Sequence, residues 1–131
     1  MFELFEKYKG QIEKDLRFDQ YNVQDLTMRL PGLKHFWVGK LIESKITLKK
    51  LEDKKKELIE TLQNNARPEI GLSKASLANI VLNNDTIKEI NRKIEEYKII
   101  IEYLEKVEKI FHNASFDIKN YLETIKIDEV K

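Results

Sequence analysis

The chain has 131 residues, of which 36% are charged and 41% apolar, and it contains only 4 Gly, 2 Pro and no Cys. This length predicts a single domain over residues 1–131, too short for a two-domain enzyme, and the shortage of turn-forming residues predicts an all-α fold. The lack of cysteine excludes disulfides, thiolate metal sites and a cysteine nucleophile.

The N-terminal region, residues 1–30, is predicted to hold two short helices. A second helical turn is expected over residues 23–30 and should end at Pro31–Gly32, although proline also suits a first helical turn and could instead open the next helix. The first helix, which should fray near Phe18, is predicted by apolar residues at helical spacing: Phe2, Phe5, Tyr8, Ile12 and Leu16.

The next predicted helix covers residues 33–64 and concentrates positive charge. From Lys34 to Lys56 it carries eight Lys against three acidic residues, a net charge of +5, whereas the whole chain carries +1. This imbalance predicts an anionic partner, with nucleic acid the leading candidate. Its apolar seam follows a heptad-like spacing through Trp37, Leu41, Ser44, Leu48, Leu51, Lys55, Leu58 and Leu62.

A connector over residues 66–85 is predicted to lead into a second long helix, residues 86–112. Thr86 with Glu89 fits a capping box at its start, with Asp85 as the competing cap. His112–Asn113 should end this helix, and a short last helix is expected over residues 115–127. The predicted fold is therefore a long antiparallel helical hairpin with short flanking helices.

Apolar residues outside the hairpin seam predict a further packing partner. The terminal helices could cover them within one chain, or neighbouring subunits could do so. Two isoleucines beside the lysine row favour the second interpretation, a homo-oligomer. The candidate subunit-contact residues are Ile42, Ile46, Ile99, Ile100 and Tyr103.

The sequence contains no pattern typical of catalysis. It has no Gly-rich phosphate loop and no metal-ligand spacing, so we expect no enzymatic activity, no cofactor and no metal. His35 could stack on a base, but a structural role is favoured. His112 should lie at a helix end, where the helix dipole favours it, and needs no other role. The acidic N-terminus and the short apolar run Ile99–Ile101 predict a soluble intracellular protein without a signal peptide or membrane span.

The lysine row fits non-specific binding to nucleic-acid phosphates, because lysines act as point charges that read no sequence. An ordinary solvated face is the alternative, and oligomerisation would favour binding by repeating the row. Phe36, Trp37 and Tyr21 could stack on bases, although burial of Trp37 in the seam is favoured. The DNA-contact candidates are Lys45, Lys49, Lys50, Lys54, Lys55 (which falls on the seam) and Lys56, with Lys34 and Lys40 as weaker candidates.

Five segments occur in a recognisable order. DLTMRLPGLKHFW at residues 25–37 leads into LKKLE at 48–52 and KKK at 54–56, and YLE at 103–105 precedes SFDIKN at 115–120. Together they resemble the UvsY recombination mediators of large tailed bacteriophages, over roughly residues 11–127 and without a diagnostic motif. Family members can carry Lys and Arg near the end of the first long helix, where this chain has ELIETL at 57–62.

The resemblance implies a small helical protein that forms a homo-oligomeric ring and binds single-stranded DNA. It also implies contacts with the phage recombinase and the phage single-strand-binding protein, which the mediator helps the recombinase replace on DNA. Such a protein would act in recombination, repair and recombination-dependent replication in the cytoplasm of the infected bacterial host, and would hydrolyse nothing itself. The alternative function is a helical-hairpin interaction or scaffold module that binds only protein.

Overall fold

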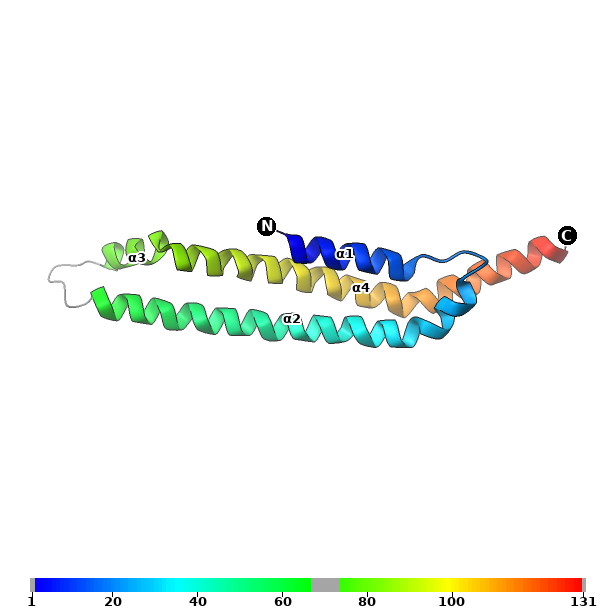
Figure 1. The fold of residues 1–131 in the computed structure, drawn as a ribbon, viewed down its shortest axis with the longest axis horizontal. Helices are drawn as coiled ribbons and strands as arrows, with labels where there is room; N and C mark the ends of the chain where they lie inside the picture. Colours follow the sequence, from blue (N-terminus) through cyan, green and yellow to red (C-terminus); the bar gives the residue numbers. More distant parts are fainter. Residues whose placement is uncertain (1, 67–73, 131) are drawn as a thin grey trace. The chain divides into compact units, whose positions relative to one another are not determined.

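A computed structural model describes residues 2–66 and 74–130, and within these ranges the chain forms four helices and no strand. The helices are α1 (Glu3–Leu16), α2 (Val23–Ala66), α3 (Lys74–Asn83) and α4 (Asp85–Val130), shown in Figure 1. The all-α prediction is confirmed. Nowhere in the described ranges is a helix both long and apolar enough to cross a membrane.

The chain divides into two compact units, each of which contains part of α2 and part of α4. Unit 1 comprises Met1–Ile42 with Ile100–Lys131, and unit 2 comprises Glu43–Ile99. Within each unit the two parts run antiparallel, as the colour order in Figure 1 shows.

The predicted helix boundary at Pro31–Gly32 is wrong, because α2 runs through both residues. Proline in a helix interior lacks the N–H that would bond the carbonyl of Thr27, and it costs about 3 kcal/mol. Apolar burial offsets that cost at roughly 1.5–3 kcal/mol for each large side chain. The turns before the proline bury Val23, Leu26 and Leu30, and Figure 1 shows the blue start of α2 bent relative to its cyan continuation.

The predicted break at His112–Asn113 is also wrong, and the two helices expected over residues 86–112 and 115–127 are one helix, α4. His112 and Asn113 are exposed, so each costs only its weak helix propensity, about 0.7 kcal/mol or less relative to alanine. Phe111 and Ala114 on either side are buried. Packing of these neighbours outweighs the local preference, and His112 lies inside the helix instead of at its end.

Unit 1 has a three-helix core in which α1 packs on both long helices. The Phe5 ring meets the Tyr103 ring of α4 edge-on, with centroids 5.1 Å apart, and Tyr8 meets Trp37 of α2 in the same way at 5.5 Å. Trp37 Nε1 donates a hydrogen bond of 3.0 Å to the Asp15 carboxylate at the end of α1. These contacts fix α1 against α2 and α4.

The segment between α1 and α2 is held by hydrogen bonds among its own residues. The Asp19 carboxylate accepts from the backbone N–H groups of Tyr21 and Asn22, at 2.8 and 3.1 Å. The Asn22 side-chain oxygen accepts from the Asp19 N–H at 2.7 Å. Phe18 packs edge-on against Tyr121 of α4, with centroids 5.3 Å apart, so this turn is anchored to the end of unit 1.

Unit 2 buries fewer side chains than unit 1 among the residues whose burial is described. Those buried in unit 2 are Ser44 of α2 and Ile87, Ile90 and Ile94 of α4. The predicted connector over residues 66–85 contains α3 at Lys74–Asn83, whereas its residues 67–73 lie outside the described part. Apart from Ser44, the α2 seam residues of this unit are only half-buried: Leu48, Leu51, Lys55, Leu58 and Leu62.

Asn84, and not the predicted Thr86 or Asp85, caps the start of α4. Its side-chain oxygen accepts a hydrogen bond of 3.0 Å from the backbone N–H of Ile87, three residues on. Glu89, the expected partner of Thr86, instead forms an ion pair of 2.7 Å with Arg92. Asn84 has the short polar side chain that favours this position.

Replacing Asn84 by alanine should therefore lower the free energy of unfolding by about 1 kcal/mol, because the helix loses its cap. Thr86→Ala serves as the control and should change stability by less than about 0.5 kcal/mol, since Thr86 is exposed. Urea denaturation of both variants measures the difference. Equal losses would show that the Asn84 cap does not matter.

Candidate nucleic-acid interface

Six lysines lie on the part of α2 that belongs to unit 2, between residues 45 and 56. With Glu52 and Asp53 they give this stretch of twelve residues a net charge of +4. The half-buried seam faces the rest of the unit and thereby directs most of the lysines outward. The stretch is about 17 Å long at 1.5 Å per residue.

The lysines occupy both flanks of the outward side of α2. At about 100° per residue, Lys45, Lys49 and Lys56 fall within about 40° of one another, and Lys50 and Lys54 lie together on the opposite flank. Lys55 falls on the seam and is half-buried, whereas the other five are exposed. The structure therefore groups five of the predicted contact residues on one outward-facing side.

The amines of these lysines are not engaged by acidic side chains. Within the described ranges, none of the six forms an ion pair or hydrogen bond. Ion pairs occur elsewhere, for example between Lys106 and Glu102 at 3.4 Å. The positive charge of this surface, which we call the α2 lysine surface (Lys45, Lys49, Lys50, Lys54 and Lys56), is open to an anionic ligand.

Lys34 and Lys40 belong to unit 1 and differ from this group. Both are half-buried. Lys40 Nζ lies over the Phe36 ring, 5.4 Å from its centroid, a cation–π geometry. Because both side chains are partly covered by the rest of unit 1, they offer less surface to a ligand, which agrees with their lower rank as DNA-contact candidates.

The aromatic residues proposed for base stacking lie in unit 1 and have different environments. Trp37 is only 2% exposed, which confirms its burial and removes it as a stacking platform. Phe36 is partly exposed, but the Trp37 ring meets it edge-on at 5.0 Å. Tyr21 is 87% exposed and is the one of the three with a ring free to contact another molecule.

The structure separates the subunit-contact candidates. Ile100 has no exposed surface within a single chain, so its prediction as a contact residue is wrong. Tyr103 and Ile99 are half-buried. Burial of the Tyr103 hydroxyl, and to a lesser extent the negative charge of Glu13, raises the pKa of Tyr103 above its usual value of 10.0. Ile42 and Ile46 are about half exposed and remain candidates.

No cluster of three or more His, Asp or Glu side chains that could hold a metal ion occurs in residues 2–66 and 74–130. His35 and His112 are both exposed. The chemistry concentrated in the described part of unit 2 is thus that of exposed, unpaired amines on one helix.

These observations define an all-helical protein with a basic surface on one of its two long helices. Its fold is shared with crystal structures of the recombination mediator protein UvsY of bacteriophage T4. The lattice type IV structure aligns with a TM-score of 0.78 and 14% identity, over 94% of this chain and 97% of that one. For lattice type II the values are 0.71 and 15%, over 96% and 97%. No protein-family model matches the sequence, and no curated protein matches it either.

Proposed function

We propose that this protein is a recombination mediator that binds single-stranded DNA non-specifically and helps load a phage recombinase onto DNA covered by single-strand-binding protein. The observation that carries the proposal is the α2 lysine surface, whose five lysines are exposed and form no ion pair with any residue that the structure describes. The fold shared with the T4 mediator supports the same role.

The lysines would act on the DNA backbone. Each amine replaces counterions at a phosphate and reads no base, so the binding is independent of sequence. A homo-oligomer would repeat the surface, and several weak contacts on one strand would raise the overall affinity steeply. The single-strand-binding protein would bind a strand held in this way less tightly. The recombinase would thereby gain access to the strand in the infected host cell.

A salt titration against a labelled single-stranded oligonucleotide tests this proposal. The logarithm of the affinity should fall with the logarithm of salt concentration with a slope of about −0.7 for each phosphate neutralised. Because the surface has five exposed lysines, the slope for each protomer engaged should be no steeper than about −3.5. Oligonucleotides of unrelated sequence should bind alike. A flat response to salt would rule out phosphate binding by this surface.

A protein-only interaction module is the second candidate function, favoured by the exposed apolar side chains of Tyr21 and Met28 in unit 1. The two proposals differ in the particle that they predict. A mediator that holds DNA multivalently should have the mass of a homo-oligomer in light scattering and bind oligonucleotides, with Ile42 and Ile46 as the proposed subunit contacts. A monomer that does not bind oligonucleotides would favour the second candidate.

A further inference from the structure

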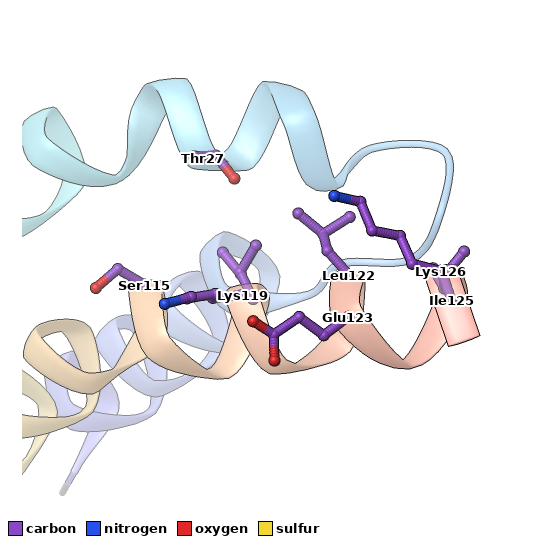
Figure 2. Close-up of a pocket in the computed structure, with 8 residues that line it drawn as sticks. Thr27, Ser115, Lys119, Leu122, Glu123, Ile125 and Lys126 are labelled. Atoms are coloured by element: carbon purple, nitrogen blue, oxygen red, sulfur yellow. The ribbon is translucent and has the colours of Figure 1, made fainter. Parts of the chain in front are cut away.

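Unit 1 contains a second open surface, where the end of α4 faces the start of α2 (Figure 2). A hollow of about 530 Å³ lies between Thr27 of α2 and the stretch of α4 from Ser115 to Lys126. A neighbouring hollow shares Thr27 and Leu122 and continues to Tyr21 and Met28. We call this continuous surface the α2–α4 groove; it is distinct from the α2 lysine surface, which lies in unit 2.

Apolar side chains form the floor of the α2–α4 groove and part of its rim. Ile118 is buried, and Leu122, one helical turn further along α4, is partly exposed. On the α2 side, Met28 is 79% exposed and Tyr21 is 87% exposed. Contiguous exposed apolar side chains mark interaction surfaces, and tyrosine and methionine are enriched at protein–protein interfaces. An aliphatic floor suits protein side chains better than nucleic-acid bases.

The charges on the α4 side of the groove are mostly positive. Lys119 and Lys126 are seven residues apart, so they lie on the same helix face with about 10 Å between them along the axis. Both are exposed, and neither forms an ion pair with any described residue. In Figure 2 Lys126 extends toward the start of α2. Among the side chains that the structure describes, Glu123 is the one acidic residue that lines the hollow.

We propose that the α2–α4 groove binds an acidic amphipathic segment of a partner protein. Apolar side chains of the segment would pack on Ile118, Leu122 and Met28. Carboxylates two helical turns apart on a helical segment would meet Lys119 and Lys126, because their separation matches that of the lysines. The inference goes beyond the proposed DNA binding and uses none of its residues.

The test measures binding of a labelled helical peptide to the full chain by fluorescence anisotropy. The peptide carries leucines at the a and d positions of its heptads, glutamates two helical turns apart and alanine and glutamine elsewhere, and a second peptide has lysine in place of every glutamate. We expect the acidic peptide to bind and the basic peptide not to bind. Lys119→Glu combined with Lys126→Glu should weaken binding of the acidic peptide roughly tenfold or more, since each interaction changes from attraction to repulsion.

Lys9→Glu combined with Lys109→Glu is the matched control. Both residues are exposed and lie outside the groove, so this variant should bind the acidic peptide as the parent does. Equal weakening by both double variants, or equal binding of both peptides, would overturn the proposal. So would a lower oligomer mass of the groove variant, which would assign the groove to a second copy of this chain, or a loss of oligonucleotide affinity, which would assign it to DNA.

Discussion

Replacing Lys49, Lys50 and Lys54 together by alanine should weaken binding to a single-stranded oligonucleotide by roughly threefold to a hundredfold at low salt. The three residues are exposed and lie on both flanks of the α2 lysine surface. An exposed charge pair is worth about 0.2–1 kcal/mol, so removal of three gives this range. The salt slope should become shallower by about 2, at about 0.7 for each phosphate that is no longer neutralised.

Lys88→Ala, Lys93→Ala and Lys98→Ala together provide the matched control for this experiment. These lysines are also exposed and also belong to unit 2, but they lie on α4 and are spread round the whole of that helix, whereas the α2 lysines are confined to the two flanks of its outward side. The control removes the same total charge. If both triple variants bind with the same reduced affinity, net charge alone explains binding and no defined surface exists. If neither has a reduced affinity, the α2 lysine surface does not bind DNA.

Apolar periodicity predicted the helical content of the chain well, because each long helix has a seam that must be buried. The sequence misled at the two predicted breaks, Pro31–Gly32 and His112–Asn113. Both interpretations rested on local preferences. Burial of Leu26 and Leu30 beside the first break, and of Phe111 and Ala114 beside the second, outweighs those preferences. The free energy of packing between helices cannot be inferred from a pair of adjacent residues.

The candidate site was predictable in part. The charge pattern alone picked out the lysines of α2, and helical geometry placed Lys55 on the seam, where the structure finds it half-buried. The burial of Ile100 could not be predicted in the same way. The sequence left open whether terminal helices or another subunit cover the broad apolar arc of the second long helix, and only the folded unit shows Ile100 buried within the chain.

The second large effect concerns the packing of α1 on α2. Replacing Trp37 by alanine should lower the free energy of unfolding by about 3–5 kcal/mol, the usual cost of truncating a buried aromatic side chain. The change leaves a cavity beside Tyr8 and removes the Nε1 hydrogen bond to Asp15. Trp37 is the one tryptophan of the chain, so urea unfolding is followed by far-ultraviolet circular dichroism and not by fluorescence.

Two further variants separate the contributions of Trp37. Trp37→Phe keeps an aromatic ring but cannot donate to Asp15, so it should cost less than alanine and at least the roughly 0.5–1.5 kcal/mol of one hydrogen bond. Tyr21→Ala removes an exposed ring and should change stability by less than about 0.5 kcal/mol. If Trp37→Ala costs no more than Tyr21→Ala, the indole contributes nothing to holding α1 in place. A large loss of stability shared by Trp37→Ala and Trp37→Phe would instead assign most of the stabilisation to the hydrogen bond with Asp15.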